Sequence, residues 1–183
     1  MLEPVFFPFP EIRTARLLLR RLEKTDALEI LSMRSDESVM KYIGKEPLKT
    51  LEEAEAWILV VQELLDTNEG ITWAISLLDE PAVLIGTMGL WRMIKQHHRA
   101  EVGYMLHSAH WNKGIAKEAL QAIIKYGFEI INLHSIEAHI NPDNIASASI
   151  LEKTGFIREA YFKENFCFRG QFTDSAVYSL LAK

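Results

Sequence analysis

The stretch from Glu101 to Ile131 constrains the fold more than any other part of the chain. It begins as an apolar run, passes through the short turn Trp111–Ala116, and continues with apolar residues at helical spacing over about 115–131. Apolar side chains that recur every three to four residues predict an amphipathic helix. A strand that leads through a short turn into a helix is typical of a mixed α/β domain.

The same patterns predict the other elements of this domain. Thr50 and Glu53 have the spacing of a capping box, which predicts where one helix begins. A break is expected near Ser35–Asp36. Helices are predicted at about 25–42, 51–66, 115–131 and 145–154, and strands at about 14–22, 71–78, 82–91, 100–106, 135–140, 156–168 and 172–181.

No repeat, linker or change of composition divides the chain, so one domain of mixed α and β structure is expected over residues 1–183. Residues 1–13 are rich in Pro and Phe and are expected to form an extended arm. Its side chains Phe6, Phe7 and Phe9 then need cover from the domain or from a partner chain.

Composition limits the class of protein. The chain has 183 residues, of which 49% are hydrophobic, and a formal net charge of −5. It lacks the basic excess of a nucleic-acid binder and any apolar run near the ~20 residues of a membrane span. The start does not read as a signal peptide, so a soluble cytoplasmic protein is expected. The single cysteine, Cys167, excludes an internal disulfide and is predicted to pack inside a strand.

The turn before the long helix has the composition of an anion site. The first N–H groups of a helix lack intrahelical partners, and Gly114 lets a ligand approach them closely. Asn112 tolerates left-handed backbone geometry, and Lys113 adds a positive charge. The alternative is an ordinary turn with its lysine in water. The two common phosphate motifs, G-x-x-x-x-G-K-[ST] and G-x-G-x-x-G, are absent, which removes support for ATP hydrolysis and dinucleotide chemistry.

A second stretch, IEAHINPDNIASASILEKTGF, covers residues 136–156. Together with the turn WNKGIA and the opening TARLLLRRL, it resembles the GNAT superfamily of acetyl-CoA-dependent N-acetyltransferases. The resemblance covers about residues 12–181 and looks most like the RimJ/RimL-type branch, which acetylates the N-termini of ribosomal proteins.

This resemblance implies a GNAT-like α/β fold. It has a central, mostly antiparallel, twisted sheet of about six to seven strands and about four flanking helices. Two strands, 100–106 and 135–140, are expected to splay apart around the pantetheine arm of acetyl-CoA, with a bulge at Met105–Leu106. Trp111 and Asn112 depart from the family, where Gln or Arg and Gly are usual. The implied cofactor-binding residues are Met105, Leu106, Trp111, Asn112, Lys113, Gly114, Ile115, Ala116, Lys117 and Asn144.

The chemistry needs a base for the amine and an acid for the leaving thiolate. His139 matches the position of the base in related N-terminal acetyltransferases, where Glu is usual, and Glu101 on the neighbouring strand is the other candidate. Many members use a helix tyrosine as the acid, but Leu151 stands in that place, so Ser147 is the substitute. Structural roles for all three candidates remain open.

The expected function is therefore transfer of the acetyl group of acetyl-CoA to a primary amine, either a small amine or a protein N-terminus. The alternative is a non-catalytic protein of the same fold that binds or senses acyl-CoA. No metal is expected, because His97 and His98 stand without a further ligand cluster. No nucleic-acid or membrane partner is expected, and both a monomer and a homodimer are compatible with the sequence.

Overall fold

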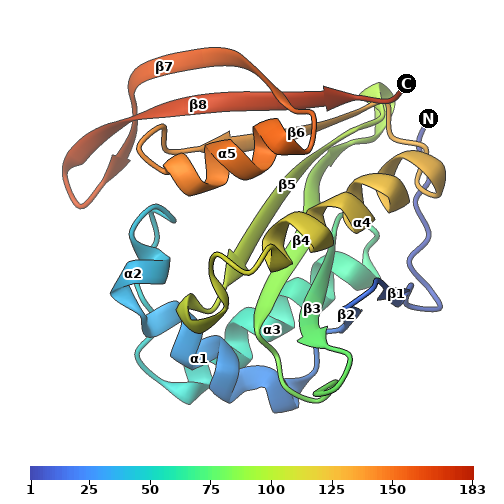
Figure 1. Ribbon diagram of the computed structural model, residues 1–183, viewed down its shortest axis with the longest axis vertical. Helices are drawn as coiled ribbons and strands as arrows, with labels where there is room; N and C mark the ends of the chain where they lie inside the picture. Colours follow the sequence, from blue (N-terminus) through green and yellow to red (C-terminus); the bar gives the residue numbers. More distant parts are fainter.

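The computed structural model describes all residues from 1 to 183 and contains one sheet of eight strands with five α-helices (Figure 1). The strands are β1 (Ile12–Arg13), β2 (Leu17–Arg21), β3 (Ile71–Leu77), β4 (Gly86–Ile94), β5 (Arg99–Leu106), β6 (Ser135–Ile140), β7 (Ile157–Phe168) and β8 (Gln171–Leu181). The helices are α1 (Ala27–Ser35), α2 (Glu37–Met40), α3 (Leu51–Asp66), α4 (Ile115–Glu129) and α5 (Ile145–Lys153).

The strand order is β1-β2-β3-β4-β5-β6-β8-β7. Every neighbouring pair is antiparallel except β5 and β6, which are parallel. The expectation of a mixed, mostly antiparallel fold is confirmed, with more elements than expected. The extra strand is the two-residue β1, which pairs with β2. The extra helix arises because the chain breaks at Asp36, whose side chain caps α2 instead of continuing α1.

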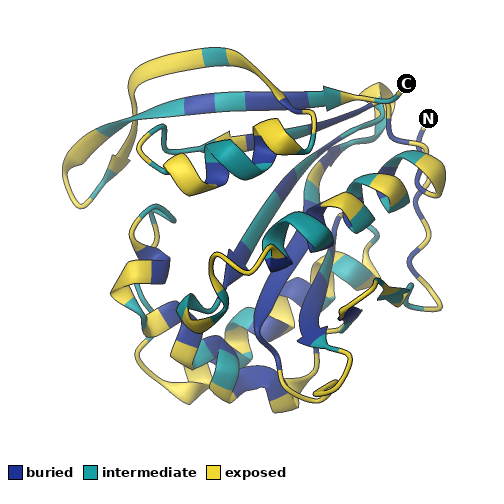
Figure 2. Ribbon diagram, in the orientation of Figure 1, coloured by how far each residue is buried: buried dark blue, intermediate teal, exposed yellow.

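Two layers of helices cover the sheet. One apolar cluster joins α4 and α5 to one face, and a second joins α1, α2 and α3 to the other. Figure 2 shows β3 and β4 as the most deeply buried strands. At the centre, Trp73 is fully buried, packs edge-on against Phe9 and Tyr126, and donates its indole N–H to the carbonyl oxygen of Pro10 at 2.7 Å.

Helix α3 begins where the capping box predicts. The Thr50 hydroxyl accepts from the N–H of Glu53 at 3.3 Å, and the Glu53 carboxylate accepts from the N–H of Thr50. The helix runs over Leu51–Asp66, as expected. None of the five helices combines the length and the apolar character needed to cross a membrane.

The N-terminal arm is fastened to the domain by its own apolar side chains. Leu2 and Phe6 are buried in the larger apolar cluster, and the N–H of Phe6 donates to Oδ1 of Asn68 at 3.1 Å. Phe9 packs on Trp73, whereas Phe7 is 86% exposed. The domain therefore covers two of the three phenylalanines.

Strands β7 and β8 form a long hairpin at the sheet edge, and β7 is exposed along nearly all its length (Figure 2). Cys167 lies in β7 and is exposed, so the prediction that it packs in the interior is wrong. The reason is that β7 is the edge strand of the sheet and most of its residues, Cys167 included, are exposed. The hairpin tip is held to the rest of the chain by an ion pair between Arg169 and Glu46.

Strands β5 and β6 separate as the resemblance implies. They pair only over Arg99–Glu101 and Ser135–Glu137, and Figure 1 shows them diverging from there. The expected bulge at Met105–Leu106 is wrong, because β5 pairs with β4 in continuous register there. The irregularity lies in β4 between Trp91 and Ile94.

Candidate active site

The N-terminus of α4 presents unoccupied backbone donors. Gly114 is the N-cap with φ of 75°, and Asn112 also has a left-handed φ of 60°. No side chain caps the helix, and the N–H groups of Ile115, Ala116 and Lys117 donate no hydrogen bond. Helices α3 and α5, by contrast, are capped by Thr50 and Asn144. Three free donors at the positive end of a helix dipole form a cradle for an anion.

Arg16, the residue before β2, supports this cradle through hydrogen bonds. Its Nη1 donates to the carbonyl oxygen of Lys113 at 3.0 Å, and its Nε donates to Glu118 at 2.7 Å. Thr14 donates its hydroxyl to the same carboxylate at 2.6 Å. Burial alone raises the pKa of Glu118, but the hydrogen bonds from Thr14 and Arg16 outweigh it and hold the pKa below the ordinary value. The carboxylate is thus neutralised beside the donors instead of repelling an anion.

The opening between β5 and β6 carries one free donor in a defined direction. The N–H of His107 donates to the carbonyl oxygen of Ile85, the residue before β4. Alternation along the antiparallel pair then turns the backbone of Met105 toward β4 and that of Leu106 away from it. The carbonyl oxygen of Leu106 accepts from the indole of Trp111 at 2.8 Å. Its N–H faces the opening, where β6 has already diverged, while the backbone groups of Met105 do not.

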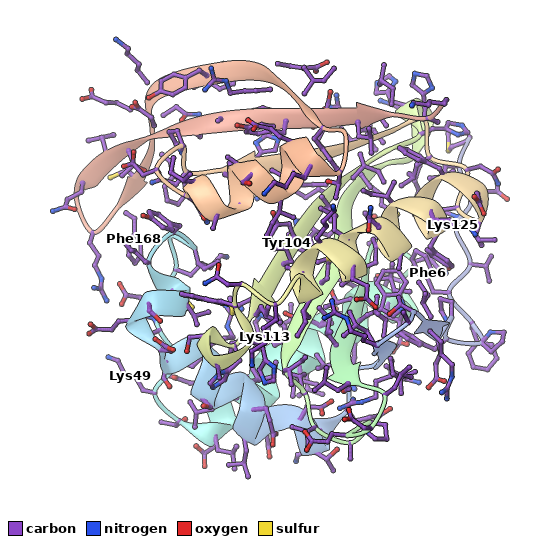
Figure 3. All side chains as sticks on the ribbon, in the orientation of Figure 1. Phe6, Lys49, Tyr104, Lys113, Lys125 and Phe168 are labelled. Carbon is purple, nitrogen blue, oxygen red and sulfur yellow. The ribbon has the colours of Figure 1, made fainter.

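A pair of hydroxyls spans the opening on the α4 and α5 side of the sheet. The Tyr104 hydroxyl lies 2.7 Å from Oγ of Ser147, and Figure 3 shows Tyr104 in the space between β5 and α5. Asn144 caps α5 by accepting from the N–H of Ser147 at 3.1 Å. Ser147 is buried, and Leu151, one turn further along α5, is fully buried in the core.

A polar cluster lies on the opposite face, toward α1 and α3. Glu101 is paired with Arg92 at 2.9 Å, and Glu137 is paired with Arg99 at 3.0 Å. Nε2 of His139 lies 3.6 Å from the carboxylate of Glu137, and the His139 side chain is 43% exposed. Because Glu101 and Glu137 are register partners on adjacent strands, Glu137 lies between the two predicted bases.

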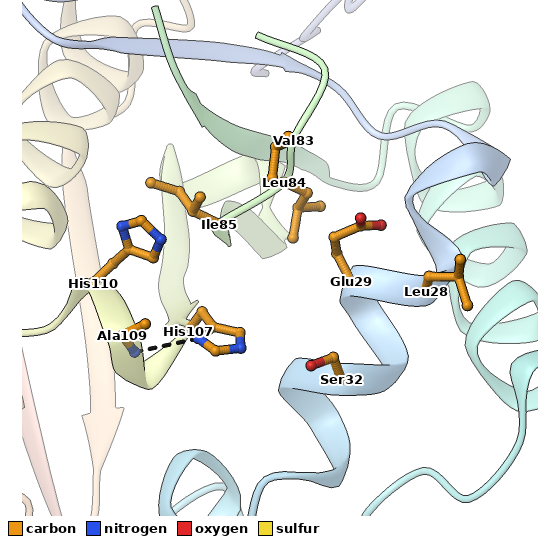
Figure 4. A pocket seen from close by; sticks show the side chains of 9 residues that line it. All are labelled: Leu28, Glu29, Ser32, Val83, Leu84, Ile85, His107, Ala109 and His110. Carbon is orange, nitrogen blue, oxygen red and sulfur yellow. Dashed lines mark hydrogen bonds between the residues drawn. The ribbon is translucent and has the colours of Figure 1, made fainter. Parts of the chain in front are cut away.

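A cavity of about 390 Å³ adjoins this face at the end of β5 (Figure 4). It is lined by Leu28, Glu29, Ser32, Val83, Leu84, Ile85, His107, Ala109 and His110. His107 accepts the N–H of Ala109 through Nδ1 at 3.2 Å. Burial lowers the pKa of His110, and the nearby charge of Lys113 lowers it further, so this ring is neutral at pH 7. The cavity is mainly apolar and separate from the cradle residues 112–117.

Comparison with known proteins identifies the family. The profile of the acetyltransferase (GNAT) domain matches residues 16–157. The chain belongs to this family. It is 35% identical over 173 residues to the uncharacterized N-acetyltransferase YoaA of Bacillus subtilis (strain 168), a match that covers 94% of this chain and 97% of that relative.

Two solved structures show how members of this acetyltransferase family differ in their acceptors. One is spermidine N-acetyltransferase from Vibrio cholerae in complex with CoA and spermine, which is 26% identical with a TM-score of 0.81 over 92% of this chain and 96% of that one. The other is ribosomal-protein-S5-alanine acetyltransferase from Vibrio fischeri, which is 25% identical with a TM-score of 0.80 over 94% of this chain and 96% of that one.

This protein is accordingly an N-acetyltransferase that uses acetyl-CoA as its co-substrate. No group of three or more His, Cys, Asp or Glu side chains lies close enough to hold a metal ion. The structure places the predicted cofactor residues around the cradle and the opening, apart from the backbone of Met105. It places His139 and Glu101 on one face of the sheet and Ser147 on the other.

Three residues around the cradle, the opening and the polar cluster were not singled out from the sequence: Arg16, Tyr104 and Glu137. Arg16 and Tyr104 meet their partners 97 and 43 residues away, so no local pattern marks them. Glu137 carries a local signal, because it precedes His139 by two residues on an alternating strand and therefore shares its face.

Proposed function

We propose that this acetyltransferase acetylates the α-amine at the N-terminus of a protein or peptide, as the RimJ/RimL-type branch does. The observation that supports this acceptor best is the state of the carboxylates on the acceptor face, because four of them already have arginine or serine partners. The relatives leave two classes of acceptor to choose between, a polyamine and a protein N-terminus.

The coenzyme is held by the cradle and the opening. The N–H groups of Ile115, Ala116 and Lys117 bind the pyrophosphate, and Lys113 adds charge. The pantetheine arm lies between β5 and β6, and the N–H of Leu106 polarises the thioester carbonyl as an oxyanion donor. Asn144 borders the arm and fixes the start of α5.

The charge of the acceptor surface favours an acceptor with a single amine. A polyamine carries several cations and needs several unpaired carboxylates. Four acidic side chains are engaged here: Glu101 pairs with Arg92, Glu137 with Arg99 and Glu46 with Arg169, while Asp36 caps α2 and accepts from Ser108. Glu29, which lines the cavity, makes no ion pair. An acceptor with a single amine is more compatible with this surface than a polycation is.

The pKa of the acceptor amine favours an α-amine as well. An α-amine has a pKa of about 7.7–8.0 and a lysine of about 10.4, so at pH 7 neutralising the first costs about 1 kcal/mol and the second about 4.6 kcal/mol. His139, oriented by Glu137, takes the proton directly or through a water molecule, and Glu101 is the second candidate. A modest base of this kind is sufficient for the α-amine.

The test is thiol release from acetyl-CoA with three matched acceptors: a peptide with a free N-terminal serine or alanine, the same peptide already acetylated at its N-terminus and containing a lysine, and spermidine. We expect turnover with the first alone, with the acetyl group located on the α-amine by mass spectrometry. His139→Gln is expected to lower kcat/KM by about 100-fold, the usual contribution of a general base.

Turnover with spermidine alone would show that the protein is an acetyltransferase but that its acceptor is a polyamine and not an α-amine. Coenzyme binding without thiol release for any acceptor would favour the non-catalytic alternative, which draws on Leu151 standing where many members have a tyrosine and on His139 standing where Glu is usual.

A further inference from the structure

Tyr104 and Ser147 form an isolated polar pair within largely apolar surroundings. Tyr104 comes from β5 and Ser147 from the first turn of α5, so their 2.7 Å contact joins the two sides of the opening that receives the pantetheine arm. Ser147 is 6% exposed, and its Oγ has no other hydrogen-bond partner.

The direction of the hydrogen bond follows from chemistry. A phenol is a stronger acid than an aliphatic alcohol, and the single proton of Tyr104 has Oγ of Ser147 at 2.7 Å as a nearer acceptor than the carbonyl oxygen of Ser147 at 3.5 Å. Tyr104 therefore donates. Its own proton stays in place because burial raises the pKa of Tyr104 to about 12, against the opposing effect of the hydrogen bond to Ser147. The proton of the Ser147 hydroxyl is left free to point into the opening.

We propose that Tyr104 is a positioning residue that orients the Ser147 hydroxyl toward the sulfur atom of the leaving coenzyme. The inference rests on the proposed acetyl transfer and adds to it the group that serves the thiolate. A hydroxyl from a residue other than Leu151 is needed, because Leu151 is fully buried and offers none.

The amine nitrogen forms a bond to the acetyl carbon, the carbon–sulfur bond breaks, and its electron pair goes to sulfur. The acceptor loses one proton to His139 before attack, and its nitrogen loses a second proton as the amide forms. Sulfur takes the proton of the Ser147 hydroxyl while Oγ takes this second proton in the same step, so neither a serine alkoxide nor a Tyr104 phenolate forms.

Two contacts hold Ser147 in this orientation. Asn144 fixes its backbone N–H and Tyr104 fixes its Oγ. The change Tyr104→Phe removes only the second contact and keeps the ring. Tyr126→Phe is the matched control, because Tyr126 is also partly buried against the main cluster and its hydroxyl makes no hydrogen bond.

The kinetic test compares Tyr104→Phe, Ser147→Ala, the double variant and Tyr126→Phe. Ser147→Ala is expected to lower kcat by about 100-fold and Tyr104→Phe by about tenfold, with KM for acetyl-CoA unchanged, and Tyr126→Phe to have no effect. The double variant is expected to be no slower than Ser147→Ala. If Tyr104→Phe lowers kcat equally in both backgrounds, or not at all, the inference is overturned.

A second measurement needs no acceptor. In the complex with coenzyme A, the ultraviolet absorbance of the thiolate gives the pKa of the bound thiol. We expect this pKa to be lower in the wild type and in Tyr126→Phe than in Tyr104→Phe and Ser147→Ala, because the hydroxyl stabilises the thiolate. Equal values in all four proteins would overturn the inference. A shifted thiol pKa without turnover on any acceptor would leave the Ser147 contact standing and contradict the proposed function.

Discussion

The guanidinium of Arg16 donates a hydrogen bond to the carbonyl oxygen of Lys113 across 3.0 Å. This contact joins the residue before β2 to the turn that begins α4, 97 residues later. The turn has exposed residues from Trp111 to Gly114 and no side-chain cap, so its shape depends on this brace. The cradle is therefore built from two distant parts of the chain.

Replacing Arg16 by Ala should weaken acetyl-CoA binding without unfolding the protein. The change removes the hydrogen bond to Lys113 and leaves the Glu118 carboxylate unneutralised beside the cradle. We expect Kd to rise about tenfold, the equivalent of one lost hydrogen bond of about 1.4 kcal/mol. Titration calorimetry measures it. Arg13→Ala is the control, because Arg13 is exposed and its side chain has no partner. Equal affinities of both variants for acetyl-CoA would show that Arg16 does not support coenzyme binding.

Glu118 should make stability depend on acid pH. Its pKa is lower in the folded protein than the ordinary 4.5, so its stabilisation is present above about pH 4.5 and is lost as the pH falls through the folded value. Glu118→Gln should lower the free energy of unfolding by about 1 kcal/mol at pH 7, and the difference from wild type should shrink toward about pH 3.

Urea unfolding across this pH range measures the effect, with Glu129→Gln as a control on the same helix. Glu129 is 61% exposed and 3.9 Å from Lys125. A difference between Glu118→Gln and wild type that stays constant with pH would contradict the role given to the carboxylate.

The N-terminal arm offers two adjacent phenylalanines in opposite environments. Phe6 is 3% exposed and Phe7 is 86% exposed. Phe6→Ala should destabilise the protein by about 3–5 kcal/mol, since it empties a core position, whereas Phe7→Ala should change stability by less than about 0.5 kcal/mol. Chemical denaturation of both variants measures this. Similar small losses for both would mean that the arm does not pack on the domain in solution.

Local signals in the sequence predict many of these elements closely. The capping box of Thr50 and Glu53 places the start of α3, and the alternation of apolar residues places β6 at Ser135–Ile140. Asn112 and Gly114 adopt the left-handed geometry that their residue types favour. These features depend on neighbours within a few residues, so they can be predicted from the local sequence.

Features that depend on residues distant in the sequence cannot be predicted from local patterns. Cys167 has the local pattern of a packed strand residue, but its strand lies at the sheet edge beyond the helices and leaves it exposed. The contacts of Arg16 with Lys113 and of Tyr104 with Ser147 arise only when the sheet brings separate segments together. The bulge expected in β5 fails because its pairing with β4 continues in register to Leu106.

The most direct test of the account is acetyl-CoA binding to the wild type, Gly114→Glu and Gly170→Glu by calorimetry. Both glycines have φ of 75°, so both changes carry the same backbone strain of about 1–2 kcal/mol. A Cβ at Gly170 meets nothing within 4 Å, and one at Gly114 meets only Arg16 at 3.5 Å, so neither change is blocked by packing. Micromolar binding by the wild type and Gly170→Glu, with none by Gly114→Glu, is the predicted result. Unchanged binding by Gly114→Glu, or no binding by the wild type, would contradict the assignment of the α4 N-terminus as the coenzyme site.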